Sequence, residues 1–250
     1  MTVHNEFISV KTITDQHLEE FMRCPYQFYQ KQFRGKPATS LKWEEMVQYV
    51  VNLVVQDFYK LPPTFRSAYK VLELIQQHWV KKVELFDSKI HYYLVLAKIT
   101  DHLTQQLVEE SSKEIPAILF EKLRVSVEEL QIELAMTFHA VEWFEDSYVV
   151  KRYIIEEDEN ILSSYRHMTT VFCNHAFHSL PERIEIVSLL SGKVHRYYPT
   201  KNDVPLALDY LQLTRNLLQE KKSYAECSCA MHKRCNGKAK WKKKEIQFTM

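Results

Sequence analysis

Four of the five cysteines stand near the two ends of the chain, one early and three late. Cys24 lies in the N-terminal part, whereas Cys227, Cys229 and Cys235 lie close together near the C-terminus. Thiolates are strong metal ligands, so this distribution predicts one metal site that joins the two ends of the chain. Zinc is one candidate, with His232 completing a mixed set of sulfur and nitrogen ligands. Thiols that bind no metal are the alternative.

A basic segment with one tryptophan surrounds and follows the last cysteine. Lysine and arginine neutralise phosphates, and an indole ring stacks on bases, so the segment predicts contact with nucleic acid. A solvated tail that only aids solubility is the alternative. The residues of the predicted contact are Lys233, Arg234, Lys238, Lys240, Trp241, Lys242, Lys243 and Lys244.

The overall composition is that of an ordinary globular protein. The chain has 250 residues and a formal net charge of +1. A net charge this close to zero gives no reason to expect binding to nucleic acid or to a membrane surface. It contains no apolar run long enough to span a membrane, and its N-terminus lacks the pattern of a signal peptide. We therefore expect a cytoplasmic protein with no membrane partner. Clustered cysteines in that compartment favour a metal site over disulfides.

The hydrophobic periodicity changes from helical to extended near the middle of the chain. An α/β protein is expected, with a mixed central β-sheet flanked by helices and a helical N-terminal part. The fourth expected helix carries Ile90, Leu94, Ala97 and Leu103. The expected elements are helices at 14–33 (broken at Pro25), 42–59, 64–82, 87–111, 160–177 and 206–220, and strands at 117–127, 130–144, 148–155, 183–190 and 193–198.

The opening helix carries Cys24-Pro25, followed after two residues by Phe28-Tyr29. This resembles the Cys-Pro-x-x-Phe-Tyr opening of the RecB/AddB-type exonuclease domain in the PD-(D/E)XK nuclease superfamily. The expected hairpin within 181–193 is similar to the late hairpin of that family. The late cysteines are similar to its Cys-x-x-Cys-x5-Cys closure, although their first spacing is one residue shorter. The resemblance covers most of the chain and implies a restriction-endonuclease-like fold and a 4Fe–4S cluster on the four cysteines.

The family's catalytic residues are an aspartate that ends a Gly-x-Ile-Asp strand and an Asp-x-Lys motif on the next strand. Two such carboxylates hold a divalent cation that activates water for attack on a phosphodiester. In this chain the first position falls on His139, and the motif falls on Arg152 and Ile154. A cation at these positions repels a metal, so the resemblance implies a nuclease fold without catalytic magnesium.

Residues 1–250 are expected to form a single nuclease-like domain. Within it, 36–115 is expected to be a helical insert, 116–225 the sheet core, and 226–250 a cysteine-bearing basic tail. The predicted function is that of a pseudonuclease that binds DNA or a protein partner in DNA processing. One alternative is an active metal-dependent nuclease that uses other acids, for example Glu133, Glu142 or Glu156. A protein-interaction scaffold with no role in nucleic-acid binding is the second alternative.

Overall fold

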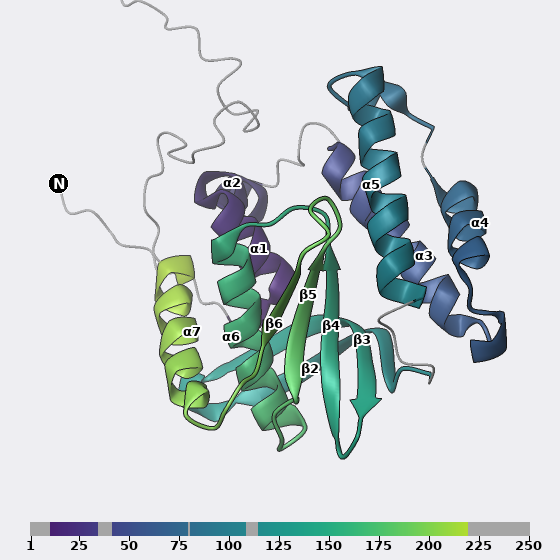
Figure 1. Ribbon diagram of the computed structural model, residues 1–250. Coiled ribbons are helices and arrows are strands. Elements are labelled where there is room, and N and C mark those ends of the chain that lie inside the picture. The colour runs from purple at the N-terminus through teal and green to yellow at the C-terminus, as the bar shows by residue number, and fades with distance from the viewer. Residues whose placement is uncertain (1–10, 35–41, 80, 109–114, 220–250) are drawn as a thin grey trace, which may run out of the picture.

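The computed structural model describes residues 11–34, 42–79, 81–108 and 115–219 (Figure 1). The three late cysteines, His232 and every residue of the basic tail lie outside these ranges. The predicted metal site and the predicted tail contact with nucleic acid therefore stay predictions, and so does the division of the chain into an insert, a core and a tail.

The N-terminal part is helical, as predicted. It begins with a short strand, β1, and continues with α1, α2, α3, α4 and α5, which span Thr12–Thr14, Asp15–Arg23, Pro25–Arg34, Trp43–Lys60, Ala68–His78 and Lys89–Val108. The side chain of Thr14 accepts a hydrogen bond from the backbone N–H of His17 (2.9 Å) and so caps α1. The helix stops at Cys24 because Pro25 has no N–H to continue it, and α2 begins at that proline.

The remaining five strands form one six-stranded mixed sheet together with β1, which pairs with β3 in parallel, and two more helices follow. Strands β2, β3 and β4 form an antiparallel meander, β4 and β5 run parallel, and β5 and β6 are antiparallel. Helix α6 crosses from β4 to β5, and α7 follows β6. The predicted mixed sheet flanked by helices is confirmed. The bounds are β2 Ile118–Val127, β3 Ile132–Phe144, β4 Ser147–Ile154, α6 Glu159–Ala176, β5 Arg183–Ser188, β6 Val194–Tyr197 and α7 Asp203–Gln219.

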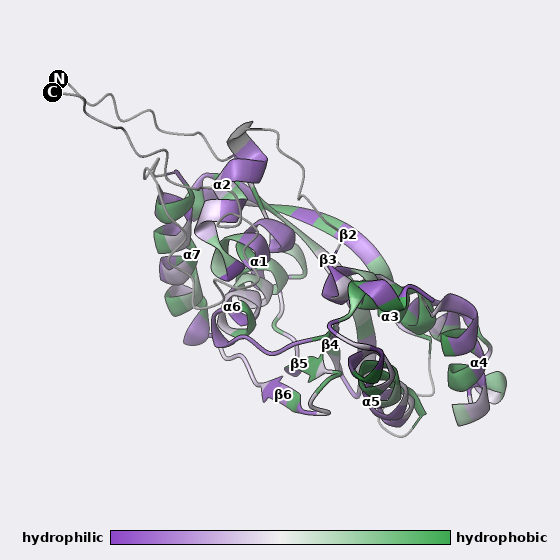
Figure 2. Cartoon of the chain, turned by 90° about the horizontal axis from the view of Figure 1, so that it is seen from above, coloured by the Kyte–Doolittle hydropathy of each residue, from purple (hydrophilic) through white to green (hydrophobic). Residues whose placement is uncertain are grey.

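Two apolar cores lie on the two faces of the sheet. Helices α1, α6 and α7 cover one face, and α3, α4 and α5 lie on the other side, as the view from above shows (Figure 2). Phe138, Val150 and Ile184 belong to the first core, whereas Ala140 and Tyr153 belong to the second. This arrangement fixes which side chains of the central strand β4 can meet each layer of helices.

Helix α5 has apolar residues on both of its sides. The buried side carries Tyr92, Val95, Ile99 and Leu103, whereas Ile90 and Leu94 are 73% and 55% exposed. Periodicity alone therefore does not identify the side of this helix that packs. Across the described ranges, no helix is both long and apolar enough to cross a membrane.

Candidate functional site

Two consecutive cations, Lys151 and Arg152, lie in the central strand β4 and are almost fully buried. Successive residues of a strand point to opposite faces. Arg152 points to the face that α1 and α6 cover, and Lys151 points to the face that α3 covers. A buried charge needs partners, and each of these cations has its own set of carboxylates.

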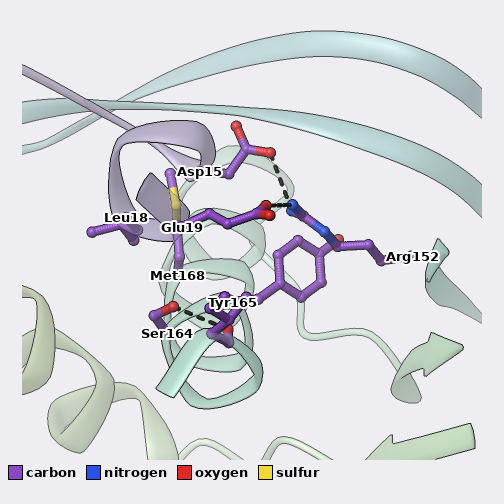
Figure 3. Close-up of a pocket in the computed structure, with 8 residues that line it drawn as sticks. Asp15, Leu18, Glu19, Arg152, Ser164, Tyr165 and Met168 are labelled. Atoms are coloured by element: carbon purple, nitrogen blue, oxygen red, sulfur yellow. Dashed lines mark hydrogen bonds and ion pairs between the residues drawn. The ribbon is translucent and has the colours of Figure 1, made fainter. Parts of the chain in front are cut away.

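On the first face, Arg152 joins α1 to the sheet. Its Nη1 donates to Oδ2 of Asp15 (3.1 Å) and its Nη2 donates to Oε2 of Glu19 (2.8 Å). The centre of its guanidinium lies 4.4 Å from the ring centroid of Tyr165 in α6. Figure 3 shows this side chain directed at both carboxylates, with the tyrosine ring beside it, at the edge of a small cavity that Leu18 and three residues of α6 also line.

The electrostatics of this group favour the fully charged state. Burial disfavours the charge on Glu19, but the neighbouring Arg152 and Arg23 outweigh it and hold the pKa of that carboxyl below its usual value. The two carboxylates likewise raise the pKa of Arg152 against the effect of its burial. The cluster is therefore a cation bound by two anions and stacked on an aromatic ring.

On the second face, Lys151 lies between two buried carboxylates. Its Nζ is 2.9 Å from Oε2 of Glu142 and 4.0 Å from Oε2 of Glu185. The side chains of all three residues are 5% exposed. The hydroxyl of Tyr59, in the last turn of α3, donates to the other carboxylate oxygen of Glu142. The packing of α3 on the sheet therefore brings a fourth polar group, the Tyr59 hydroxyl, to this buried cluster.

His139 lies where β3 and β4 separate, just beyond the last pair of their ladder, Ala140 with Lys151. Its Nδ1 accepts a hydrogen bond from the backbone N–H of Tyr153 (3.3 Å), so the ring proton belongs on Nε2. The imidazole stacks on Phe120, with ring centroids 4.9 Å apart. Burial, and secondly the charge of Arg152, lowers the pKa of His139 to about 3. The ring is thus neutral near pH 7.

The structure brings some of the sequence-predicted positions together. His139 and Arg152 are electrostatic neighbours. Ile154 is buried in the apolar core beside α1 and α6 and has no polar role. Two of the acids considered for an active nuclease, Glu133 and Glu142, bind different cations. Glu133 binds Arg124 (3.0 Å), and Glu142 binds Lys151.

No group of three or more histidine, cysteine, aspartate or glutamate side chains placed to hold a metal ion occurs in the part of the chain that the structure describes.

Cys24 is buried at the junction of α1 and α2. Nearby in α2, the hydroxyl of Tyr29 donates to the backbone oxygen of Leu217 (2.7 Å), and the oxygen of Leu218 is 3.3 Å away. Both carbonyls belong to the last turn of α7, whose final residue is Gln219. The region of the early cysteine is therefore tied to the helix that precedes the late cysteines.

Sequence reasoning missed the partners of the two buried cations: Asp15, Glu19, Tyr59, Tyr165 and Glu185. These partners lie in four elements, α1, α3, α6 and β5, which are distant from one another in the chain. A signal for their existence was present, because Lys151-Arg152 interrupts an otherwise apolar strand. Two charges in a buried strand require opposite charges nearby, although the sequence does not say which ones.

No protein-family model matches the chain, and no curated protein matches it. One similar solved structure is that of a Eubacterium rectale protein described as a "Putative exonuclease". The two sequences are 9% identical, the match covers 83% of this chain and 80% of that chain, and the TM-score is 0.47. The protein SSO0001 is 10% identical, with 82% of this chain and 78% of that chain covered and a TM-score of 0.33. At these values, neither likeness informs the function of this chain.

Proposed function

We propose that the chain is a catalytically inactive nuclease-like protein that binds DNA or a protein partner in DNA processing. The single observation that carries the proposal is the buried Lys151-Arg152 pair in the central strand, at the place where the family that the sequence resembles has metal-binding acids. Each cation is bound by carboxylates of this chain.

A catalytic divalent cation needs carboxylates that face it and are not bound to another charge. Here Asp15 and Glu19 bind Arg152, and Glu142 binds Lys151 and Tyr59. A metal would have to displace a buried lysine or arginine and would then be repelled by it. The neutral His139 adds no negative charge at the remaining position.

Nuclease assays test the catalytic part of the proposal. The full chain is expected to cleave neither single-stranded nor double-stranded DNA with Mg²⁺ or Mn²⁺. Glu142→Gln is the matched variant, because Glu142 is a buried acid of the central sheet that an active enzyme could use and it binds Lys151 (2.9 Å). Metal-dependent cleavage by the wild type that this variant loses would establish the active nuclease instead.

DNA binding is tested by measuring affinity at several salt concentrations, because phosphate contacts give a steep dependence on salt. A variant with the lysines of 238–244 replaced by glutamine is expected to bind more weakly and with a lower slope. Binding to neither single nor double strands by the wild type would remove the DNA-binding role and favour the protein-interaction scaffold.

We further propose that Cys24, Cys227, Cys229 and Cys235 bind a 4Fe–4S cluster, or that three of them bind zinc with His232. The hydrogen bond from Tyr29 to Leu217 supports this proposal, because it holds the surroundings of Cys24 next to the end of α7. When bound, such a metal group would act as a cross-link, and its binding free energy would add to folding stability.

Protein purified without oxygen distinguishes these two metal sites by its colour and its iron and zinc content. Cys24→Ser and Cys235→Ser are each expected to lower the melting temperature and to release the metal. Cys173→Ser is the matched control, because this buried cysteine lies in α6 and should cost stability without changing the metal content. Purified protein with neither iron nor zinc would eliminate the proposed site.

A further inference from the structure

The side of α5 that faces away from the core carries an apolar stripe. Ile90, Tyr93, Leu94 and Ala97 recur at spacings of three and four residues, so they lie on one side of the helix. All four are exposed, and the exposed fraction of Tyr93 is 53%. Apolar side chains on both sides of one helix indicate that both sides are covered in the assembled protein. Among the described residues, only one side of α5 is covered.

The stripe is complementary to a second copy of itself in the antiparallel direction. When two such helices pair about a two-fold axis between Tyr93 and Leu94, the large Ile90 faces the small Ala97 of the second copy, and Tyr93 faces Leu94. The ring of Tyr93 already packs edge-on against Tyr92, with ring centroids 5.1 Å apart. A partly fixed aromatic side chain loses little conformational freedom on binding, which favours association.

One edge of the stripe is acidic at its start and basic at its end. Asp87, His91, Leu94 and Lys98 follow one another along this edge at spacings of four, three and four residues. Oδ2 of Asp87 lies 3.3 Å from Nδ1 of His91, which places the carboxylate along the edge. The Asp87 side chain is still 84% exposed, so it can accept a further cation. Lys98 is also exposed.

These charges favour the antiparallel pair over the parallel one. In an antiparallel two-fold pair the same edges meet in opposite directions, so Asp87 comes beside Lys98 of the second copy, with an offset of about 3 Å along the helix axis. A parallel pair would instead place like charges side by side. Asp101, which is 85% exposed, comes beside the first turn of the second helix, where the helix dipole and Lys89 favour a negative charge.

We propose that two copies of this chain associate through the α5 stripe, with the two helices antiparallel about a two-fold axis. The apolar residues form the centre of the contact, and the pairs of Asp87 with Lys98 lie at its rim. Because one helix packed on one helix is a small interface, we expect a dissociation constant in about the micromolar range. The inference does not depend on the proposed DNA-binding role.

Sedimentation equilibrium of the full chain under reducing conditions tests the contact. The wild type is expected to change from monomer to dimer as its concentration rises. Leu94→Glu should raise the dissociation constant about a hundredfold, because the substitution occurs twice in a two-fold dimer and each occurrence costs about tenfold. Ile90→Glu is a second variant with the same expectation. Leu213→Glu is the matched control, because this leucine is 65% exposed on α7, and it should leave the dissociation constant unchanged.

A charge exchange tests the direction of the two helices. Asp87→Lys and Lys98→Asp, each alone, should raise the dissociation constant about tenfold, because both place like charges at the rim. The double variant should return close to the wild-type value, because each copy then supplies both members of the reversed pair. Melting temperatures of all variants show whether the fold is kept.

Three results would overturn the inference. A wild type that stays monomeric at every concentration would show that no such dimer forms. Association that survives both Leu94→Glu and Ile90→Glu, or that Leu213→Glu weakens equally, would place the contact elsewhere. A double charge variant that associates no better than the single variants would exclude the antiparallel arrangement. Failure of DNA binding would leave the dimer untouched, so the two proposals are tested separately.

Discussion

Acid should destabilise this protein through His139. The folded pKa of about 3 lies far below the value of 6.5 for an exposed imidazole, so the unfolded chain takes up a proton first as the pH falls. The stabilising contribution of the neutral ring is complete above pH 6.5 and is lost progressively toward pH 3. One proton contributes about 1.4 kcal/mol per pH unit in this interval, which gives a loss of about 2 kcal/mol at pH 5.

The assay is urea denaturation at several pH values between 7.5 and 5, for the wild type and for His139→Asn. Asparagine does not titrate, and its side-chain oxygen can accept the hydrogen bond that Nδ1 receives from Tyr153. Other histidines contribute equally to both proteins, so the difference between the two stability profiles isolates His139. We expect the wild type to lose about 2 kcal/mol more than the variant over this range. Parallel profiles would refute the reasoning.

Two further predictions concern the packing of the sheet. Arg152→Met leaves the carboxylates of Asp15 and Glu19 without their buried cation and should cost about 3 kcal/mol of unfolding free energy, measured with urea. The triple variant with Asp15→Asn and Glu19→Gln should recover most of that loss, and no recovery would show that the ion pairs are not its source. Gly192→Ala should lower stability by about 1–2 kcal/mol, because Gly192 has φ +75° and an added Cβ would lie 2.7 Å from Nε2 of His102. The same change in a His102→Ala background should cost less, and an equal cost would exclude the steric contact.

The sequence predicted the elements that have strong local signals. The valine-rich helix α3, the three-strand meander and the break at Pro25 were all expected, because periodicity and proline act within a few residues. Strand β1 was missed because its three residues carry no such signal, and it forms by parallel pairing with β3 at Glu133 to Ala135.

The partners of the buried cations could not be predicted for a different reason. Asp15 and Glu19 lie in the first helix and read as ordinary surface acids at its start. Their role depends on α1 packing against β4, which is a tertiary contact between distant parts of the chain. The sequence showed that Arg152 is a charged residue in an otherwise apolar strand, but only the fold identifies what binds it.

The tie between Tyr29 and the end of α7 has a consequence for the order in which the protein folds during synthesis. The core beside α1 contains Leu18 and Phe21 from the first helix and Leu211 and Leu218 from the last. Helix α6, on which α1 packs, is synthesised after α3, α4 and α5, whereas these three helices are consecutive and can pack as soon as they emerge. We expect proteolysis of stalled nascent chains to find α3–α5 protected before α1, and earlier protection of α1 would contradict this order. Until α6 is synthesised, the apolar side of α1 lacks the distant helix that packs on it, and this uncovered side is a surface that a chaperone could bind.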